Sequence, residues 1–119
     1  MGELHCLNGL FVILLALALA VWAFRRHRTG KEIRGADQAL IGAAQLALLV
    51  QVFTGITLLD RRGRMPYLHY VAGFLPILFY MGLYWFYPQL RSRWALALSL
   101  AALATVLSAV AAFLIGFSS

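Results

Sequence analysis

Residues 94–117 read WALALSLAALATVLSAVAAFLIGF, a run without a charged side chain. Roughly 20 apolar residues in a helix cross the hydrocarbon core of a membrane, which is about 30 Å thick. Three further segments have the same character, at about 4–24, 38–59 and 67–87. The sequence therefore predicts an all-α integral membrane protein, with one four-span transmembrane domain over residues 1–119.

The composition supports this class and excludes others. Of the 119 residues, 63% are hydrophobic and only 12% are charged, far from the balance of a water-soluble domain. The net charge of +6 comes from basic residues in short breaks between the apolar runs, rather than on a broad polar surface. A soluble enzyme and a nucleic-acid-binding protein are therefore not expected, and the lipid bilayer is the expected partner.

The short connections predict an up-down-up-down four-helix bundle. One side of the membrane receives seven basic residues, namely Arg25, Arg26, Arg28, Lys31, Arg34, Arg91 and Arg93. The other side receives three, namely Arg61, Arg62 and Arg64. By the positive-inside rule, both termini lie on the outer side of a bacterial inner membrane. No basic residue precedes the first span, so we expect a retained anchor rather than a signal peptide.

Two similar segments begin the first and third spans. Residues 4–9 read LHCLNG and residues 68–73 read LHYVAG, so both follow the pattern Leu-His-x-x-x-Gly. This indicates an internal two-hairpin pseudo-repeat, in which His5 corresponds to His69. Both histidines then lie in the first outer turn of diagonally opposed helices, at the same depth in the membrane.

This pair predicts a haem site. Two neutral imidazoles can supply both axial ligands of a haem iron, which leaves no open position for a substrate. Gly9 and Gly73 lie four residues after His5 and His69, on the same helical face, and would leave room for the flat ring. Because no CxxCH attachment motif is present, the expected cofactor is non-covalent haem b, with His5 and His69 as the metal ligands.

Other residues are candidates for contact with the haem. Arg61, Arg62 and Arg64 directly precede the third span and could pair with haem propionates, or they could be ordinary solvated loop charges. Tyr70 lies beside the second histidine, and Gln51 lies in the outer half of the second span. Gln51 could equally form a hydrogen bond with a neighbouring helix.

The pattern of four spans with one histidine on each of two alternate helices resembles a half-unit of the haem A synthase family, and more generally the four-helix membrane cytochromes b. The resemblance covers the whole chain as architecture, and Leu4-His5 with Gly9 and Leu68-His69 with Gly73 as residues. It implies haem b between the two histidines. In that family the ligands lie on the second and fourth helices, whereas here they lie on the first and third, and no span contains a glutamate that could match the family's catalytic acid. These departures favour an electron carrier over oxidative haem modification.

The predicted function is electron transfer through one haem near the outer membrane face. A single haem near one face carries no charge across the membrane, so the expected partners are a larger membrane redox complex, a quinone or a redox protein. Catalysis is not expected, because no nucleophile lies beside a base and no carboxylates are paired at depth. The sequence does not distinguish haem b from another planar tetrapyrrole held by the same two histidines.

Several alternatives remain open. The chain could be a cofactor-free accessory subunit of a respiratory or photosynthetic complex, with structural histidines. Cys6 beside His5 raises the possibility of copper or zinc, although second-shell support for such a site is not evident. A small multidrug-type transporter would need a carboxylate within a span. The four acidic residues instead lie at span ends or in loops, namely Glu3, Glu32, Asp37 and Asp60.

Overall fold

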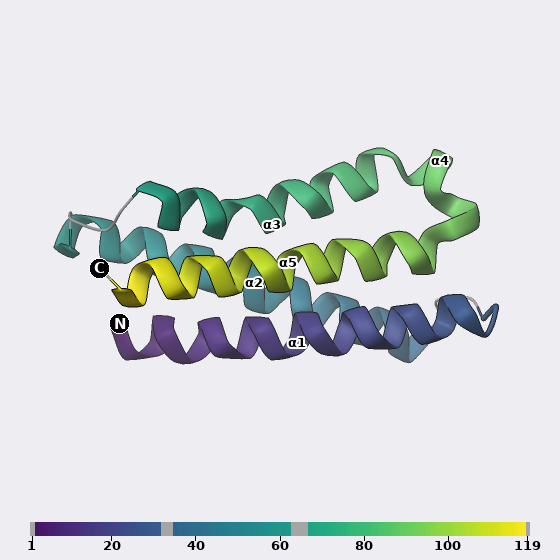
Figure 1. Ribbon diagram of the computed structural model, residues 1–119, viewed down its shortest axis with the longest axis horizontal. Coiled ribbons are helices and arrows are strands. Elements are labelled where there is room, and N and C mark those ends of the chain that lie inside the picture. The colour runs from purple at the N-terminus through teal and green to yellow at the C-terminus, as the bar shows by residue number, and fades with distance from the viewer. Residues whose placement is uncertain (1, 32–34, 63–66, 119) are drawn as a thin grey trace.

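The computed structural model describes residues 2–31, 35–62 and 67–118, and for residues 2, 57–62, 117 and 118 it describes the backbone only. Four long helices lie side by side along the long axis of the molecule, which measures 47 Å (Figure 1). They are α1 (Gly2–Arg28), α2 (Gly35–Arg62), α3 (Tyr67–Trp85) and α5 (Trp94–Ser118). Both termini lie at one end of the molecule (Figure 1). The described part of the chain contains no strand.

The helices extend beyond two of the predicted spans and stop short of a third. Helix α1 continues through the basic residues 25–28, because cations are favourable in the last turn of a helix. Helix α3 ends at Trp85, two residues before the predicted end. The cause is Pro88, which starts the short helix α4 (Tyr87–Leu90) and lacks the N–H needed in a helix interior. A single turn, η1 (Arg91–Arg93), then leads into α5.

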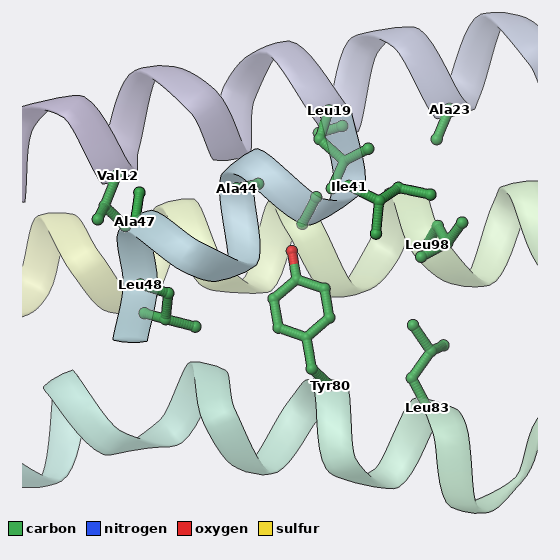
Figure 2. Packing of buried hydrophobic residues seen from close by; sticks show 12 residues of the cluster. Val12, Leu19, Ala23, Ile41, Ala44, Ala47, Leu48, Tyr80, Leu83 and Leu98 are labelled. Atoms are coloured by element: carbon green, nitrogen blue, oxygen red, sulfur yellow. The ribbon is translucent and has the colours of Figure 1, made fainter. Parts of the chain in front are cut away.

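The core is built from small and branched side chains of all four long helices. Helix α1 packs against α2 and α5, whereas α3 packs mainly against α5 and touches α2 only sparsely. Leu98 and Ala102 of α5 are fully buried. Figure 2 shows Tyr80 projecting from α3 into the space among the other helices. The packing of α5 is tight enough for the Ser99 hydroxyl to donate a hydrogen bond to the Ala20 carbonyl of α1, at 2.8 Å.

Large apolar side chains cover the outer faces of the long helices. Examples from each helix are Leu7, Phe53, Leu78 and Leu107, all of them exposed. Such an extensive apolar surface is typical of a protein that faces lipid. Four helical segments are long and apolar enough to cross a membrane, which is compatible with a multi-pass membrane protein.

Candidate functional site

The two histidines meet at the end of the bundle that holds both termini. His5 lies in the second turn of α1 and His69 lies in the first turn of α3. Their ring centroids are 6.3 Å apart and the ring planes are 68° apart. Because α1 and α3 each pack against α5 rather than extensively against each other, the histidines face each other across the bundle interior.

Helix α2 orients the His5 ring. The Thr54 hydroxyl donates to the Gln51 carbonyl at 3.0 Å, and a hydroxyl oxygen that donates can also accept. His5 Nδ1 lies 2.9 Å from this oxygen. This arrangement favours the tautomer with the proton on Nδ1, which leaves a lone pair on Nε2. Thr54 is only 4% exposed, so the pairing lies away from water.

The side chains of Asn8 and Gln51 form a second hydrogen-bonded group, which lies beside Nε2 of His5. Asn8 Nδ2 donates to the Ala47 carbonyl at 3.0 Å and to Gln51 Oε1 at 3.1 Å. With its oxygen engaged in this way, the Gln51 amide turns its Nε2 toward Nε2 of His5, at 3.4 Å. That distance is at the long end of the range for a hydrogen bond.

Helix α5 orients the His69 ring. His69 Nδ1 lies 2.6 Å from the backbone carbonyl oxygen of Ala112, and a carbonyl can only accept. The proton of a neutral His69 is therefore on Nδ1, and its Nε2 carries a lone pair. The Tyr70 ring stands edge-on to His69, with centroids 5.7 Å apart. Both histidines are thus held through Nδ1, with Nε2 as the basic nitrogen.

The two matched glycines have different surroundings. A Cβ at Gly9 would lie 2.8 Å from Gln51 Nε2, so the amide of Gln51 fills the room that we predicted for a flat ring. A Cβ at Gly73 would have nothing within 4 Å, so that side is open. Gly55 of α2 also matters, because a Cβ there would lie 3.1 Å from His5 Cε1. The absence of a side chain at Gly55 lets the His5 ring lie against α2.

The remaining candidates are the three arginines of the outer loop and Cys6. The side chains of Arg61 and Arg62, and all of Arg64, lie outside the described residues. Cys6 is a free, exposed cysteine, and within the described ranges no three His, Cys, Asp or Glu side chains gather as a metal site. The copper or zinc alternative therefore lacks a ligand set among these residues.

Sequence reasoning did not identify the role of Asn8. Asn8 falls inside the LHCLNG segment, but only the rotation of α1 against α2 reveals that it holds the Gln51 amide. The signal available in the sequence was a polar residue, Asn8, about one turn after the candidate ligand His5.

Comparisons of the chain with family models, curated proteins and solved structures find no match.

Proposed function

We propose that this chain is a small integral membrane haem b protein that transfers single electrons, with His5 and His69 as the two axial ligands. The observation that carries the proposal is the geometry of this pair. The rings lie 6.3 Å apart, and each is held through Nδ1 with Nε2 as the basic nitrogen. That is the arrangement in which an imidazole binds a metal while its other nitrogen donates a hydrogen bond.

The separation of the rings suits one iron between them. The ring centroids are 6.3 Å apart. A metal ion held by one histidine through Nε2 would therefore lie close to the ring of the other.

The partners of the histidines hold the two rings in place. The Thr54 hydroxyl and the Ala112 carbonyl each accept a hydrogen bond from Nδ1–H, which fixes the tautomer and the ring orientation. Gln51 Nε2 lies 3.4 Å from His5 Nε2, so Gln51 is the group that would move away when a metal binds there. The open side at Gly73 is where we place the bulk of the flat ring.

The haem iron supplies one-electron chemistry when bound, alternating between its ferric and ferrous states. Ligation by both histidines leaves no position open for oxygen or substrate, which favours electron transfer over catalysis. Arg61, Arg62 and Arg64 are the proposed propionate partners, and Tyr70 packs beside the ligand His69. Because the site lies near one end of the bundle, we propose a larger membrane redox complex, a quinone or a redox protein as electron partner.

We further propose the up-down-up-down topology, with both termini outside a bacterial inner membrane and the two-hairpin pseudo-repeat relating the two histidine helices. The unequal basic charge at the two ends supports this orientation. The likeness to a half-unit of the haem A synthase family is proposed on the same residues.

The second candidate is a cofactor-free accessory subunit of a respiratory or photosynthetic complex. One observation favours it: the Gln51 amide fills the space beside Gly9 and links His5 to Asn8. In this reading the polar residues join α1 to α2, as hydrogen-bonding side chains do between membrane helices.

A pyridine haemochrome assay on detergent-purified protein distinguishes the two candidates. The proposal expects about one haem b per chain in the wild type, and His69→Ala should lose it while the protein stays inserted and helical. His27→Ala is the matched control, because His27 is exposed at the basic end of α1 and should leave the haem in place. A colourless wild type, purified with its native assembly intact, would favour the accessory subunit.

A further inference from the structure

A separate hollow lies at the other end of α1, away from both termini. It encloses about 190 Å³ and is lined by Trp22, Arg25, Arg26, Thr29 and Lys31. These residues belong to the last turns of α1 and the segment that follows it. In Figure 1 this end of α1 lies opposite the end of the bundle that holds the two chain termini. Three of the five lining residues are cationic and none is acidic.

The local backbone explains how a basic hollow forms at a helix C-terminus. Gly30 adopts a left-handed conformation with φ of 68°, which turns the chain back over α1. Lys31 N–H then donates to the Arg26 carbonyl at 2.9 Å, and Gly30 N–H donates to the His27 carbonyl at 3.2 Å. The Thr29 hydroxyl donates to the Arg25 carbonyl at 2.9 Å. These bonds cover the electronegative helix end and hold Lys31 beside Arg25 and Arg26.

Arg26, one of the three lining cations, already pairs with a carboxylate. Arg26 Nη2 lies 3.3 Å from a carboxylate oxygen of Asp37, and its guanidinium stacks 5.3 Å from the Trp22 ring centroid. Trp22 Nε1 also donates to the same carboxylate oxygen. Asp37 therefore offsets Arg26 and fixes both Arg26 and Trp22. Among the described residues, Arg25 and Lys31 are the lining cations that provide positive charge for a ligand.

We propose that this hollow binds a phosphate group, and specifically the headgroup phosphate of an acidic phospholipid. Arginine and lysine are the side chains that recognise phosphate oxygens, and basic pockets beside membrane helices bind anionic headgroups. Trp22 places an amphipathic ring at the wall of the hollow, directly above the apolar part of α1, where a glycerol backbone would pass. This inference is independent of haem binding.

The test is native mass spectrometry of the whole protein in detergent, titrated with phosphatidylglycerol or phosphatidylcholine. The wild type should retain phosphatidylglycerol in preference. The double variant Arg25→Gln with Lys31→Gln should weaken retention more than tenfold, because it removes two of the three cations that line the hollow. Arg28→Gln with Arg91→Gln is the charge-matched control, because both cations lie outside this lining; it should change retention less than twofold.

Three results would overturn the proposal. Equal retention of the two lipids would remove the preference for an anionic headgroup. Equal loss in the charge-matched control and in the Arg25/Lys31 double variant would assign the binding to general positive charge. Saturable binding of inorganic phosphate by delipidated protein, without any preference for phosphatidylglycerol, would assign the hollow to a free phosphate. Thermal melts of every variant establish that each one remains folded.

Discussion

The two ends of the bundle are built differently. At the end with the termini, the interior is polar and connected by hydrogen bonds, through His5, Asn8, Gln51, Thr54 and His69. Toward the other end, the interior is closed by apolar side chains, among them Leu19, Ala23, Leu83 and Leu98 (Figure 2). Tight packing holds membrane helices together, whereas interior polar groups are costly unless they are satisfied. The comparison teaches that apolar packing closes one end of the bundle, whereas the other end carries the hydrogen-bonded side chains of the candidate site.

The largest effect should come from overpacking the apolar end. Ala102→Leu adds atoms at a position that is fully buried, so we expect a loss of about 2–3 kcal/mol in the free energy of unfolding. Unfolding by sodium dodecyl sulfate in mixed micelles measures it. Ala111→Leu adds the same atoms on an exposed face of α5 and should change stability by less than about 0.5 kcal/mol. Equal effects of the two variants would contradict the role assigned to this core.

A smaller loss should follow from separating α1 and α2 at their basic end. Asp37 is 2% exposed and holds both Trp22 and Arg26. Asp37→Ala should cost about 2 kcal/mol, because it leaves the partly exposed Arg26 without its carboxylate. Asp37→Asn should recover part of this loss, since an amide oxygen can still accept from Trp22. The same unfolding assay applies, and haem content should stay constant if the two ends are independent.

The polar end should respond mainly in ligand binding. Thr54→Val keeps the shape of the side chain but removes the acceptor for the Nδ1 proton of His5. We expect haem affinity to fall about tenfold, the lower part of the range for losing a partner of a metal ligand. Haem transfer to apomyoglobin measures this change. Thr105→Val is the control, because Thr105 is also buried but lies in α5, where its hydroxyl donates to the Ala101 carbonyl at 2.9 Å. Equal effects would contradict a specific role for Thr54.

The smallest effect should separate the two matched glycines. Gly73→Ala places a methyl group in open space and improves helix propensity, so the haem-free protein should gain about 0.5 kcal/mol of stability. Haem occupancy should fall, because the proposed ring needs this space. Gly9→Ala should instead displace the Gln51 amide, which lies 2.8 Å from the new Cβ. Unchanged occupancy in Gly73→Ala would argue against placing the ring on that side.

Much of the fold could be predicted from apolar runs alone, because a membrane span needs a long apolar helix whatever surrounds it. The early end of α3 at Trp85 was not predicted, although Pro88 supplies its physical reason. At the candidate site, the two Leu-His-x-x-x-Gly segments predicted facing histidines, and the rings lie 6.3 Å apart. That they bind haem stays a prediction.

The partners of the histidines could not be predicted from the sequence. Which face of α2 meets α1 depends on how all four helices rotate and pack, and local spacing does not determine this rotation. The Gln51 amide beside Gly9 and the Ala112 carbonyl at His69 are consequences of that packing. A backbone carbonyl also has no residue type that would mark it in a sequence.

The central claim is that His5 and His69 bind the same iron. Electron paramagnetic resonance of the oxidised, purified protein tests it most directly, because two axial imidazoles give ferric haem a low-spin signal. We expect a low-spin signal in the wild type and its loss in both His5→Ala and His69→Ala, where one of the two ligands is missing. A wild type that is already high-spin, or a low-spin signal unchanged in both His5→Ala and His69→Ala, would contradict it.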